Sequence, residues 1–527
     1  MDTMLRLTVM MTMLCATIAL WYVSAMANGV STEPPVVLIA FEPENFAPLR
    51  LTPHPSACQG FNLIIPGELE RTPRDYAKVT AAVKATGATK ATLALVDILN
   101  REYKSDTLKL KKDQAAEIGI DMATAGRPIS MLRTVRMYVE GAPLDVSSLR
   151  MTCAIEKLPE PDVTVQGPMD DTSIQAALNS LGEDGGVVYI PAGTYLINNQ
   201  VTIPCDNVTV YGDGTATIIQ GTWYDAKALF IAVKRSNLRL TRLSFRSLPI
   251  TEFRGYNEKQ HAKRPEDVDK PCVLSRGIEL SSCQNVRVDH CEIALFGHAG
   301  VAFYGGTENL VDHCFLRENF RYGYGYGVAT PGTKELYIED NNFENHRHGI
   351  AGNAGGASYI ARFNRLVKYA KLFPSWNQSP DGINQLRAHE IDAHDNCGWI
   401  YAHDNFVAMY DAVMGGGAMM RGNQGWLYRN VFESCSPGIM CIGDSDDVWA
   451  WDNVSDKPDT LYVNSASGAI HFDEKPPNFA EFPYPYALNR PGWWPGADEG
   501  CGTISRPDTQ FAGPTESLVL RSVGTGQ

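Results

Sequence analysis

The chain has 527 residues, 44% of them hydrophobic, and a formal net charge of -14 at pH 7. That acidity argues against a nucleic-acid-binding protein, which needs a basic face. It also means that a polyanionic ligand is repelled overall, so local Arg or Lys would have to hold it. The 46 Gly and 31 Pro indicate a chain with many turns.

Residues 1–27 have the pattern of a signal peptide. Arg6 precedes an apolar run over Leu7–Val23, and Ala25–Ala27 supplies the small-x-small cleavage pattern. The alternative is an uncleaved anchor. No later stretch approaches the ~20 apolar residues that a membrane span requires. We therefore expect a secreted protein, periplasmic or extracellular, with no membrane contact after signal cleavage.

Residues 28–160 resemble short strands separated by turns. The strand-like runs are Ala91–Asp97, Thr107–Leu110, Ile129–Tyr138 and Leu149–Glu156. Arg74–Thr86 favours a short helix. We expect a small, β-sandwich-like accessory domain here. The sequence does not distinguish a carbohydrate-binding role from that of a spacer.

A new pattern begins at Asp171. Asp171–Leu181 has helical periodicity with an acidic start, and Gly185–Tyr195 (GGVVYIPAGTY) follows. This order resembles the opening of the right-handed parallel β-helices of the pectate-lyase superfamily, in which such a helix caps the open end of the solenoid. The resemblance implies an all-β fold for residues 161–475, a three-sheet β-helix with an N-terminal helix cap.

Internal repetition supports the solenoid. Val286–Cys291 (VRVDHC) recurs as Leu310–Cys314 (LVDHC), which stacks His290 on His313 and Cys291 on Cys314, the cysteines as buried thiols. Later coils repeat an apolar pattern that ends in Asn. These residues are Asn341, Asn364, Asn405, Asn430 and Asn453. We expect them to form an internal hydrogen-bonded ladder between coils ~4.8 Å apart. One long step implies an insertion at about Lys368–Leu386.

Helical patterns of useful length are missing between the strands of Gly185–Asp473, which argues against an α/β fold. The remaining residues, 476–527, are rich in Pro near their start. We expect them to form an extended strap along the solenoid.

The ladder fixes a register, and four polar residues then share one edge of the solenoid on adjacent or near-adjacent coils. These edge residues are Arg276, Tyr326, His348 and His389. Further polar residues cluster around them, namely Tyr324, His346, Arg347, Asp392, His394 and Asp395. A structural role is the competing interpretation for any single His. The combination of Tyr, His, Arg and Asp at one register favours a site that holds a linear polymer across the coils.

Two segments are similar in order and spacing to segments of the mannuronan C5-epimerases. They are Tyr322–Val328 (YGYGYGV) and Arg347–Gly352 (RHGIAG), and together they cover about thirty residues. Those enzymes follow the first segment with an acid-Pro-His-acid motif, whereas Ala329–Gly332 reads ATPG. The nearest comparable element is His389–Asp395 (HEIDAHD). The resemblance therefore implies epimerase chemistry without carrying over all of its residues.

A lyase or a C5-epimerase removes the C5 proton of a uronic acid after the neighbouring carboxylate has been neutralised. Arg347 or Arg276 would neutralise it, because a guanidinium binds a carboxylate at two points. His348 or His389 would take the proton as a base that titrates near neutrality.

Tyr326 would return a proton, and Asp392 would orient a His. The expected substrate-binding residues are Arg276, Tyr324, His346, His394 and Asp395. We therefore expect a secreted polysaccharide lyase or C5-epimerase that acts on a uronate-containing polymer.

Two other classes of function stay open. A glycoside hydrolase needs two carboxylates, ~5 Å apart if retaining and ~6.5–9.5 Å apart if inverting. Asp392 with Asp395, or the acids of Asp444–Asp447, could supply them. A non-enzymatic polysaccharide-binding or adhesin solenoid is the other class. The sequence requires no cofactor, although His389, Asp392 and His394 could hold a divalent cation.

Overall fold

The computed structural model describes residues 49–53, 60–63, 73, 76–121, 131–153, 158–223, 226–248, 275–319, 324–353, 355–369, 389–394, 396–410, 416–422, 424–477 and 479. The expected signal peptide and most of the expected insertion and strap lie outside these residues. Within them, no helix combines the length and the apolar character needed to cross a membrane. The chain divides into two compact units, of which the first contains residues 76–125 and 132–153.

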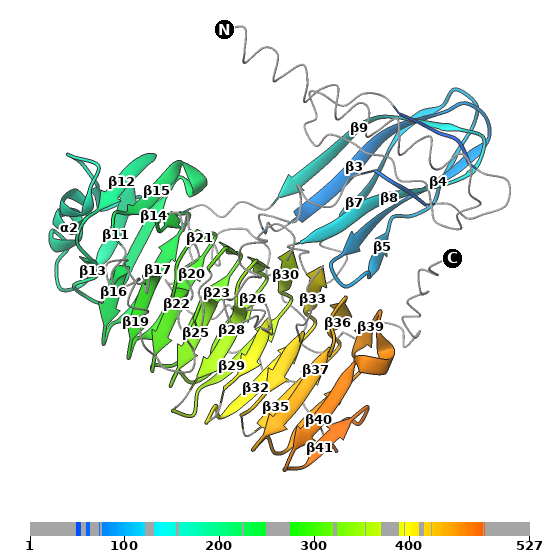
Figure 1. Cartoon of the computed structure of the whole chain (residues 1–527). Helices are drawn as coiled ribbons and strands as arrows, with labels where there is room; N and C mark the ends of the chain where they lie inside the picture. The colour runs from blue at the N-terminus through cyan, green and yellow to red at the C-terminus, as the bar shows by residue number, and fades with distance from the viewer. Residues whose placement is uncertain are drawn as a thin grey trace, which may run out of the picture. The chain divides into compact units, whose positions relative to one another are not determined.

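The N-terminal unit consists of two antiparallel sheets (Figure 1). The four-stranded sheet has the order β1 (Leu49–Leu51), β9 (Leu144–Cys153), β3 (Tyr76–Ala85) and β7 (Ala115–Asp121). The five-stranded sheet has the order β2 (Gly60–Asn62), β8 (Leu132–Gly141), β4 (Thr89–Asp97) and β5 (Glu102–Lys104), with β6 (Leu108–Leu110) also paired to β4. The β-rich character expected for this region is confirmed.

The short helix expected at Arg74–Thr86 is wrong, because this segment forms strand β3. Val79, Ala81, Val83 and Ala85 are buried at every second position, which is the period of a strand with one face on a core. Pairing with β9 on one side and β7 on the other supplies the backbone hydrogen bonds.

The second unit is a parallel β-helix of three sheets, whose successive coils run from green to orange in Figure 1. Sheet 1 contains β10 (Val163–Thr164), β11 (Gly186–Ile190), β14 (Val208–Gly212), β17 (Ser236–Thr241), β20 (Gln284–Asp289), β23 (Leu310–Asp312), β26 (Leu336–Glu339), β29 (Ser358–Arg362), β32 (Trp399–His403), β35 (Gln424–Tyr428), β38 (Val448–Trp451) and β41 (Ile470–Phe472). Sheet 2 contains β12 (Gly193–Ile197), β15 (Thr217–Gly221), β18 (Ser244–Arg246), β21 (Glu292–Ala294), β24 (Phe315–Arg317), β27 (Asn342–Glu344), β30 (Arg365–Tyr369), β33 (Phe406–Tyr410), β36 (Val431–Glu433) and β39 (Val454–Ser455). Sheet 3 contains β13 (Val201–Thr202), β16 (Ala228–Val233), β19 (Arg276–Ser281), β22 (Ala299–Tyr304), β25 (Tyr326–Pro331), β28 (His348–Asn353), β31 (Ile391–Ala393), β34 (Ala418–Met420), β37 (Ile439–Gly443) and β40 (Tyr462–Ala466). The chain visits the three sheets in turn, which confirms the predicted fold.

Helix α2 (Asp171–Asn179) caps the first coil, as predicted. The side chain of Asp170 accepts hydrogen bonds from the backbone N–H groups of Thr172 and Ser173 and so starts the helix. Ile174 and Leu178 are fully buried in the core of the solenoid and close its end. Two short 3₁₀ helices complete the elements of the described residues, η3 (Gly214–Ala216) and η7 (Pro458–Thr460).

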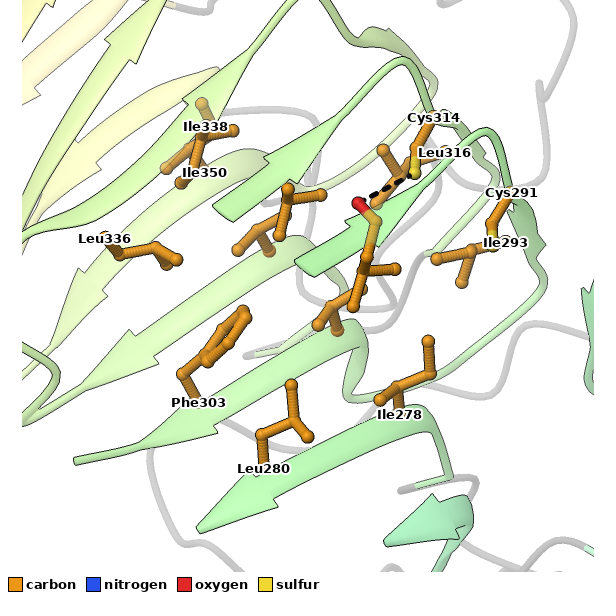
Figure 2. Close-up of a cluster of buried hydrophobic side chains, with 14 of the residues drawn as sticks. Ile278, Leu280, Cys291, Ile293, Phe303, Cys314, Leu316, Leu336, Ile338 and Ile350 are labelled. Atoms are coloured by element: carbon orange, nitrogen blue, oxygen red, sulfur yellow. Dashed lines mark hydrogen bonds between the residues drawn. The ribbon is translucent and has the colours of Figure 1, made fainter. Parts of the chain in front are cut away.

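The interior of the coils is filled by stacked apolar side chains. Figure 2 shows Ile278, Leu280 and Phe303 among them, together with Cys291 and Cys314. Both cysteines are buried free thiols, as predicted, and the Sγ of Cys314 lies 3.5 Å from the carbonyl oxygen of Val288. A structural role for these thiols follows.

The predicted asparagine ladder is confirmed at the turn between sheets 1 and 2. The Nδ2 of Asn364 donates to the Oδ1 of Asn405 (3.0 Å) and to the carbonyl of Ile338 (2.8 Å). Its own Oδ1 accepts from the backbone N–H of Asn341 (3.1 Å). The preceding residue, Phe363, has a positive φ of 56°, and each ladder Asn follows such a residue. Each turn is thus tied to the coil on either side of it.

The described part of the expected strap is residues 476–477 and 479. The ring of Phe479 packs edge-on against those of Trp451 (4.8 Å between centroids) and Tyr428 (5.2 Å).

Candidate functional site

The predicted edge residues do share one register, at the start of the strands of sheet 3. Arg276 pairs with Ala299, Ala299 with Tyr326, and Tyr326 with His348. The ring of His348 lies between two others, 5.6 Å from that of Tyr326 and 5.5 Å from that of His389, at interplanar angles of 17° and 20°. Tyr326, His348 and His389 therefore form one stack of rings over three coils.

A column of glycines beside this stack lets the coils approach closely. Each of Gly277, Gly300, Gly327 and Gly349 directly follows an edge position. A Cβ on Gly327 would lie only 2.5 Å from the carbonyl oxygen of Gly349, so a larger residue would push the coils apart. The repeated x-Gly-apolar motif is a sequence signal for this edge.

Glu390 replaces glycine on the coil of His389, and its side chain is completely buried. Burial raises the pKa of Glu390, although the ammonium of Lys368 opposes the shift from 3.0 Å away. Lys368 also donates to the backbone carbonyl of Arg347 (3.1 Å). This buried pair, which sequence reasoning missed, therefore holds the turn that carries Arg347.

Asp392 is a second centre of contacts. Its side chain is fully buried on β31, and its Oδ2 lies 3.3 Å from the Nε2 of His348 and 3.0 Å from the Nε2 of His394. The Nη2 of Arg421 lies 2.5 Å from the same oxygen and 3.0 Å from the Nδ1 of His394. Sequence reasoning missed Arg421. Because Asp392 pairs with Met419, extending the strand register by one coil would have placed Arg421 beside His394.

The tautomer of His348 follows from its neighbours. Its Nδ1 lies 2.7 Å from the carbonyl oxygen of His389, which can only accept, so Nδ1 carries the proton. Burial first, and then the charge of Arg347, lower the pKa of His348 well below its ordinary value. The ring is therefore neutral at pH 7, and the lone pair on Nε2 faces Asp392.

Several polar atoms of the cluster are buried without a hydrogen-bond partner in the described part of the chain. They include His348 Nε2, His389 Nδ1, Asp392 Oδ1, Arg347 Nη1 and Arg421 Nε. Buried polar atoms are rarely left unpaired in folded proteins, so a group of them in one place marks these side chains as candidates for binding a ligand, an ion or ordered water.

His389 and Tyr326 have protonation states suited to acid–base chemistry. Burial lowers the pKa of His389 to about 4, so its imidazole is neutral at pH 7. Burial raises the pKa of Tyr326, which therefore keeps its proton. A neutral imidazole can accept a proton, and a neutral phenol can donate one.

Arg276 and Tyr324 lie at the other end of the stack. The Nε of Arg276 donates to the Nδ1 of His298 (2.7 Å) and to the hydroxyl of Tyr304 (3.1 Å), and its Nη1 lies 3.1 Å from Glu279. Tyr324 packs edge-on against His298, with 5.0 Å between the ring centroids. The guanidinium of Arg276 is thus already engaged by its neighbours.

His346 lies in the interior of the solenoid and not among the substrate-binding residues, where it was expected. Its side chain is completely buried, and its Nε2 lies 3.0 Å from the carbonyl oxygen of Leu316. Burial lowers its pKa to about 3, and its ring packs edge-on against Phe343. This interior position gives it a packing role in place of the expected substrate contact. Asp395 lies outside the described residues.

The remaining candidates for paired carboxylates hold a turn. Asp446 Oδ1 accepts from the backbone N–H groups of Asp447 (3.0 Å) and Ala469 (2.8 Å), and Asp447 accepts from the indole of Trp449. The cation-binding group considered from sequence also changes. Among the described residues, His348 replaces His389 beside Asp392 and His394, with one ligand atom from each of the three within 4.8 Å of the others.

Comparison with known proteins supports the fold. Residues 164–368, which include Tyr326, Arg347 and His348, match the family described as rhamnogalacturonase A/epimerase, pectate lyase-like. No curated protein matches the sequence significantly.

Three similar solved structures are at most 14% identical to this chain. ORF18 of Geobacillus virus E2 is 14% identical with a TM-score of 0.37, and the match spans 57% of each chain. The alginate lyase from Paenibacillus sp. str. FPU-7 is 14% identical over 59% of this chain and 99% of its own, with a TM-score of 0.36. A hyperthermoactive exopolygalacturonase from Thermotoga maritima is 12% identical over 61% of this chain and 93% of its own, with a TM-score of 0.41. The three parallel sheets form a β-helix, and its residues 164–368 are similar to the pectate lyase-like family, as the opening helix and the GGVVYIPAGTY segment predicted.

Proposed function

We propose that this chain is an exported enzyme that removes the C5 proton of a uronate residue in a polysaccharide, either as a lyase or as a C5-epimerase. The observation that carries the proposal is the stack of Tyr326, His348 and His389 on three coils, with Arg347 in the adjoining turn. The stack provides an acid, a base and a carboxylate-binding cation on a rigid scaffold.

Arg347 is the better partner for the uronate carboxylate. Its Nη1 is buried without a hydrogen-bond partner in the described part of the chain, whereas Arg276 already binds His298, Tyr304 and Glu279. A bound carboxylate would supply the missing acceptor and spread the charge that develops when the C5 proton leaves. In a chain of net charge -14, such a local cation is also what would hold a polyanion.

His389 is the better base. The Nδ1 proton of His348 is donated to a backbone carbonyl and its Nε2 faces Asp392, so neither nitrogen is free to act on a substrate. The Nδ1 of His389 has no hydrogen-bond partner among the described residues. The negative charge of a bound uronate would raise the pKa of His389 from about 4 toward neutrality, where a base is most effective.

Tyr326 would then act as the acid. Its raised pKa keeps the phenol protonated until the reaction needs a proton. In a lyase the proton goes to the leaving glycosidic oxygen, and in an epimerase it goes to the opposite face of the C5 carbon. Asp392 orients the His394 ring beside this pair, with its Oδ2 3.0 Å from the Nε2 of His394.

The test is a depolymerisation and exchange screen of the purified chain. Alginate, pectate, glycosaminoglycans and neutral glycans are incubated with it, while absorbance of unsaturated uronate and reducing ends are followed in parallel. Deuterium incorporation at C5 from heavy water is measured on the same samples. The matched variants are His389→Gln and, as a control, His290→Gln, which changes a half-buried His beside Asp289 on sheet 1.

A rise in absorbance that His389→Gln abolishes and His290→Gln leaves intact is the result expected of a lyase. Deuterium incorporation without chain cleavage, with the same dependence on His389, is the result expected of an epimerase. Reducing ends without absorbance would replace the proposal with a hydrolase. Silence in all three assays on every polymer would favour a binding protein.

A further inference from the structure

His348, the middle ring of the stack, converges with His394 on Asp392 in a way that the proposed proton transfers do not use. His348 reaches Asp392 from the preceding coil, and His394 reaches it from the end of the same strand. Both present Nε2 to the same carboxylate oxygen, at 3.3 and 3.0 Å. The rings of the two histidines are nearly perpendicular, with 5.7 Å between their centroids.

The contact between His348 and Asp392 is unfavourable as it stands. Because Nδ1 of His348 carries the proton, Nε2 directs a lone pair at a carboxylate oxygen, and two acceptors face each other in the interior. The other oxygen of the carboxylate, Oδ1, is also buried and has no hydrogen-bond partner in the described residues. A cation between these atoms would satisfy the lone pairs of both residues.

The distances suit a transition metal. Ligand atoms about 2.0–2.1 Å from a tetrahedral ion lie about 3.3 Å from one another. The two nitrogen–oxygen distances are close to this value before any adjustment. The bond from the Nδ1 of His348 to the carbonyl of His389 is also the kind of outer contact that fixes a metal-binding histidine in the correct tautomer.

We propose that His348, Asp392 and His394 form a binding site for one divalent transition-metal ion, with zinc the ion that best suits two imidazoles and one carboxylate. Calcium is disfavoured, because it takes oxygen ligands. Three protein ligands leave a fourth position open, as in catalytic rather than structural zinc sites. The site follows from these contacts alone and does not depend on which polymer, if any, the chain acts on.

Arg421 would become an outer contact of the loaded site. Its Nη2 can keep its bond to Asp392, in the way that metal-binding carboxylates are commonly held from outside. Its contact with the Nδ1 of His394 would be lost, because Nδ1 must carry the proton when Nε2 binds a metal. The His394 side chain is 20% exposed, so the ion would enter from that side.

The test uses the full purified chain after removal of metals with a chelator. Zinc chloride is titrated by calorimetry, and cobalt chloride is titrated while its visible absorption is recorded. The two site variants are Asp392→Asn, which keeps the shape of the side chain, and His394→Gln, at the partly exposed ligand. His290→Gln is the matched control, since His290 also lies beside a carboxylate, 2.9 Å from Asp289.

We expect one zinc ion per chain, with affinity at least about 100-fold weaker in both site variants and unchanged in the control. Cobalt should give the intense visible bands of a tetrahedral site in the unaltered chain only. Zinc should also raise the melting temperature of the unaltered chain and not that of His394→Gln. Equal zinc affinity in the unaltered chain and His394→Gln, with equal metal-free melting temperatures, would overturn the proposal. So would the absence of any zinc binding by the unaltered chain.

Discussion

The solenoid contains two buried groups of Arg, Asp and His that have opposite characters. The arginine–aspartate cluster lies on sheet 1 and consists of Arg239, Arg287, Asp289, His290, Asp312 and His313. The histidine cluster lies at the start of the strands of sheet 3 and consists of Tyr326, Arg347, His348, His389, Asp392, His394 and Arg421. Their residue types are nearly the same, so composition does not separate them.

The arginine–aspartate cluster is held by paired contacts. Arg287 binds both oxygens of Asp312 (2.8 and 2.6 Å), and Arg239 binds both oxygens of Asp289 (2.8 and 2.7 Å). Burial alone would raise the pKa of Asp312, yet Arg287 and His313 lower it to about 2. As predicted for a structural ladder, the ring of His313 stacks on that of His290 (4.9 Å).

The histidine cluster instead keeps buried polar atoms without hydrogen-bond partners, in the described part of the chain, on at least five side chains, namely Arg347, His348, His389, Asp392 and Arg421. The comparison teaches that hydrogen-bond satisfaction, more than the presence of His and Asp, separates a structural network from a candidate site. Four experiments can break or sharpen this distinction.

Replacing Arg347 by Met should cost activity and leave stability nearly unchanged. Loss of one preorganised donor to the uronate carboxylate typically lowers kcat by about 10²–10³. We expect a loss near the upper end, with kcat/KM reduced as much, measured on whichever uronate polymer the screen identifies. A melting temperature lowered in proportion to the activity would place Arg347 with the structural network instead.

Replacing Arg287 by Met should lower stability and leave activity nearly unchanged. Arg287 is 1% exposed, and its loss leaves the buried Asp312 carboxylate without its main partner. Breaking such a pair typically costs about 3–5 kcal/mol of the free energy of unfolding. Urea denaturation followed by circular dichroism measures this loss. Activity per folded molecule should stay as in the unaltered chain, and a selective loss of activity would contradict the comparison.

Asn364→Ala should lower the free energy of unfolding by about 2–3 kcal/mol, because it leaves the buried N–H of Asn341 and the carbonyl of Ile338 unpaired. Urea denaturation followed by circular dichroism measures this loss. Thr202→Ala, at an exposed position in β13, is a control that should change stability by less than about 0.5 kcal/mol.

The smallest expected effect is in the dependence of stability on pH. His346 has a pKa of about 3 in the folded chain and about 6.5 when unfolded, so the unfolded chain binds one more proton between these values. Its contribution to stability is therefore lost as pH falls from 6.5 toward 3. In His346→Gln the slope of unfolding free energy against pH should be shallower by about 1.4 kcal/mol per pH unit over pH 4–5.5. An unchanged slope would show that His346 titrates normally in the folded chain.

Much of the fold could be predicted because its signals are periodic. The spacing of Asn341 and its equivalents sets the coil register, and that register places Tyr326, His348 and His389 on one edge. The helix expected at Arg74–Thr86 was wrong because a local preference was outweighed by pairing between strands far apart in the sequence. Its many Ala and Lys residues favour a helix locally, but pairing with two neighbouring strands outweighs that preference.

The parts of the site that escaped prediction do not follow the periodic pattern. His346 lies in a turn, where the alternation of a strand no longer fixes the direction of a side chain. Lys368 and Glu390 are a pair only because two coils separated by a long connection stack on each other. Predicting the position of Arg421 would have required extending the strand register by one coil beyond that connection.

The asparagine ladder also determines where this solenoid can change in evolution. Between sheets 1 and 2, the ladder coils turn in two residues, such as 340–341 and 363–364, and the stacked amides leave no room for insertion. Between sheets 2 and 3, the connection varies from 345–347 to 370–390 and 247–275. Insertions and deletions can therefore accumulate at the corner beside the histidine cluster, so descendants of this chain can acquire new ligand preferences while the stacked scaffold is inherited unchanged.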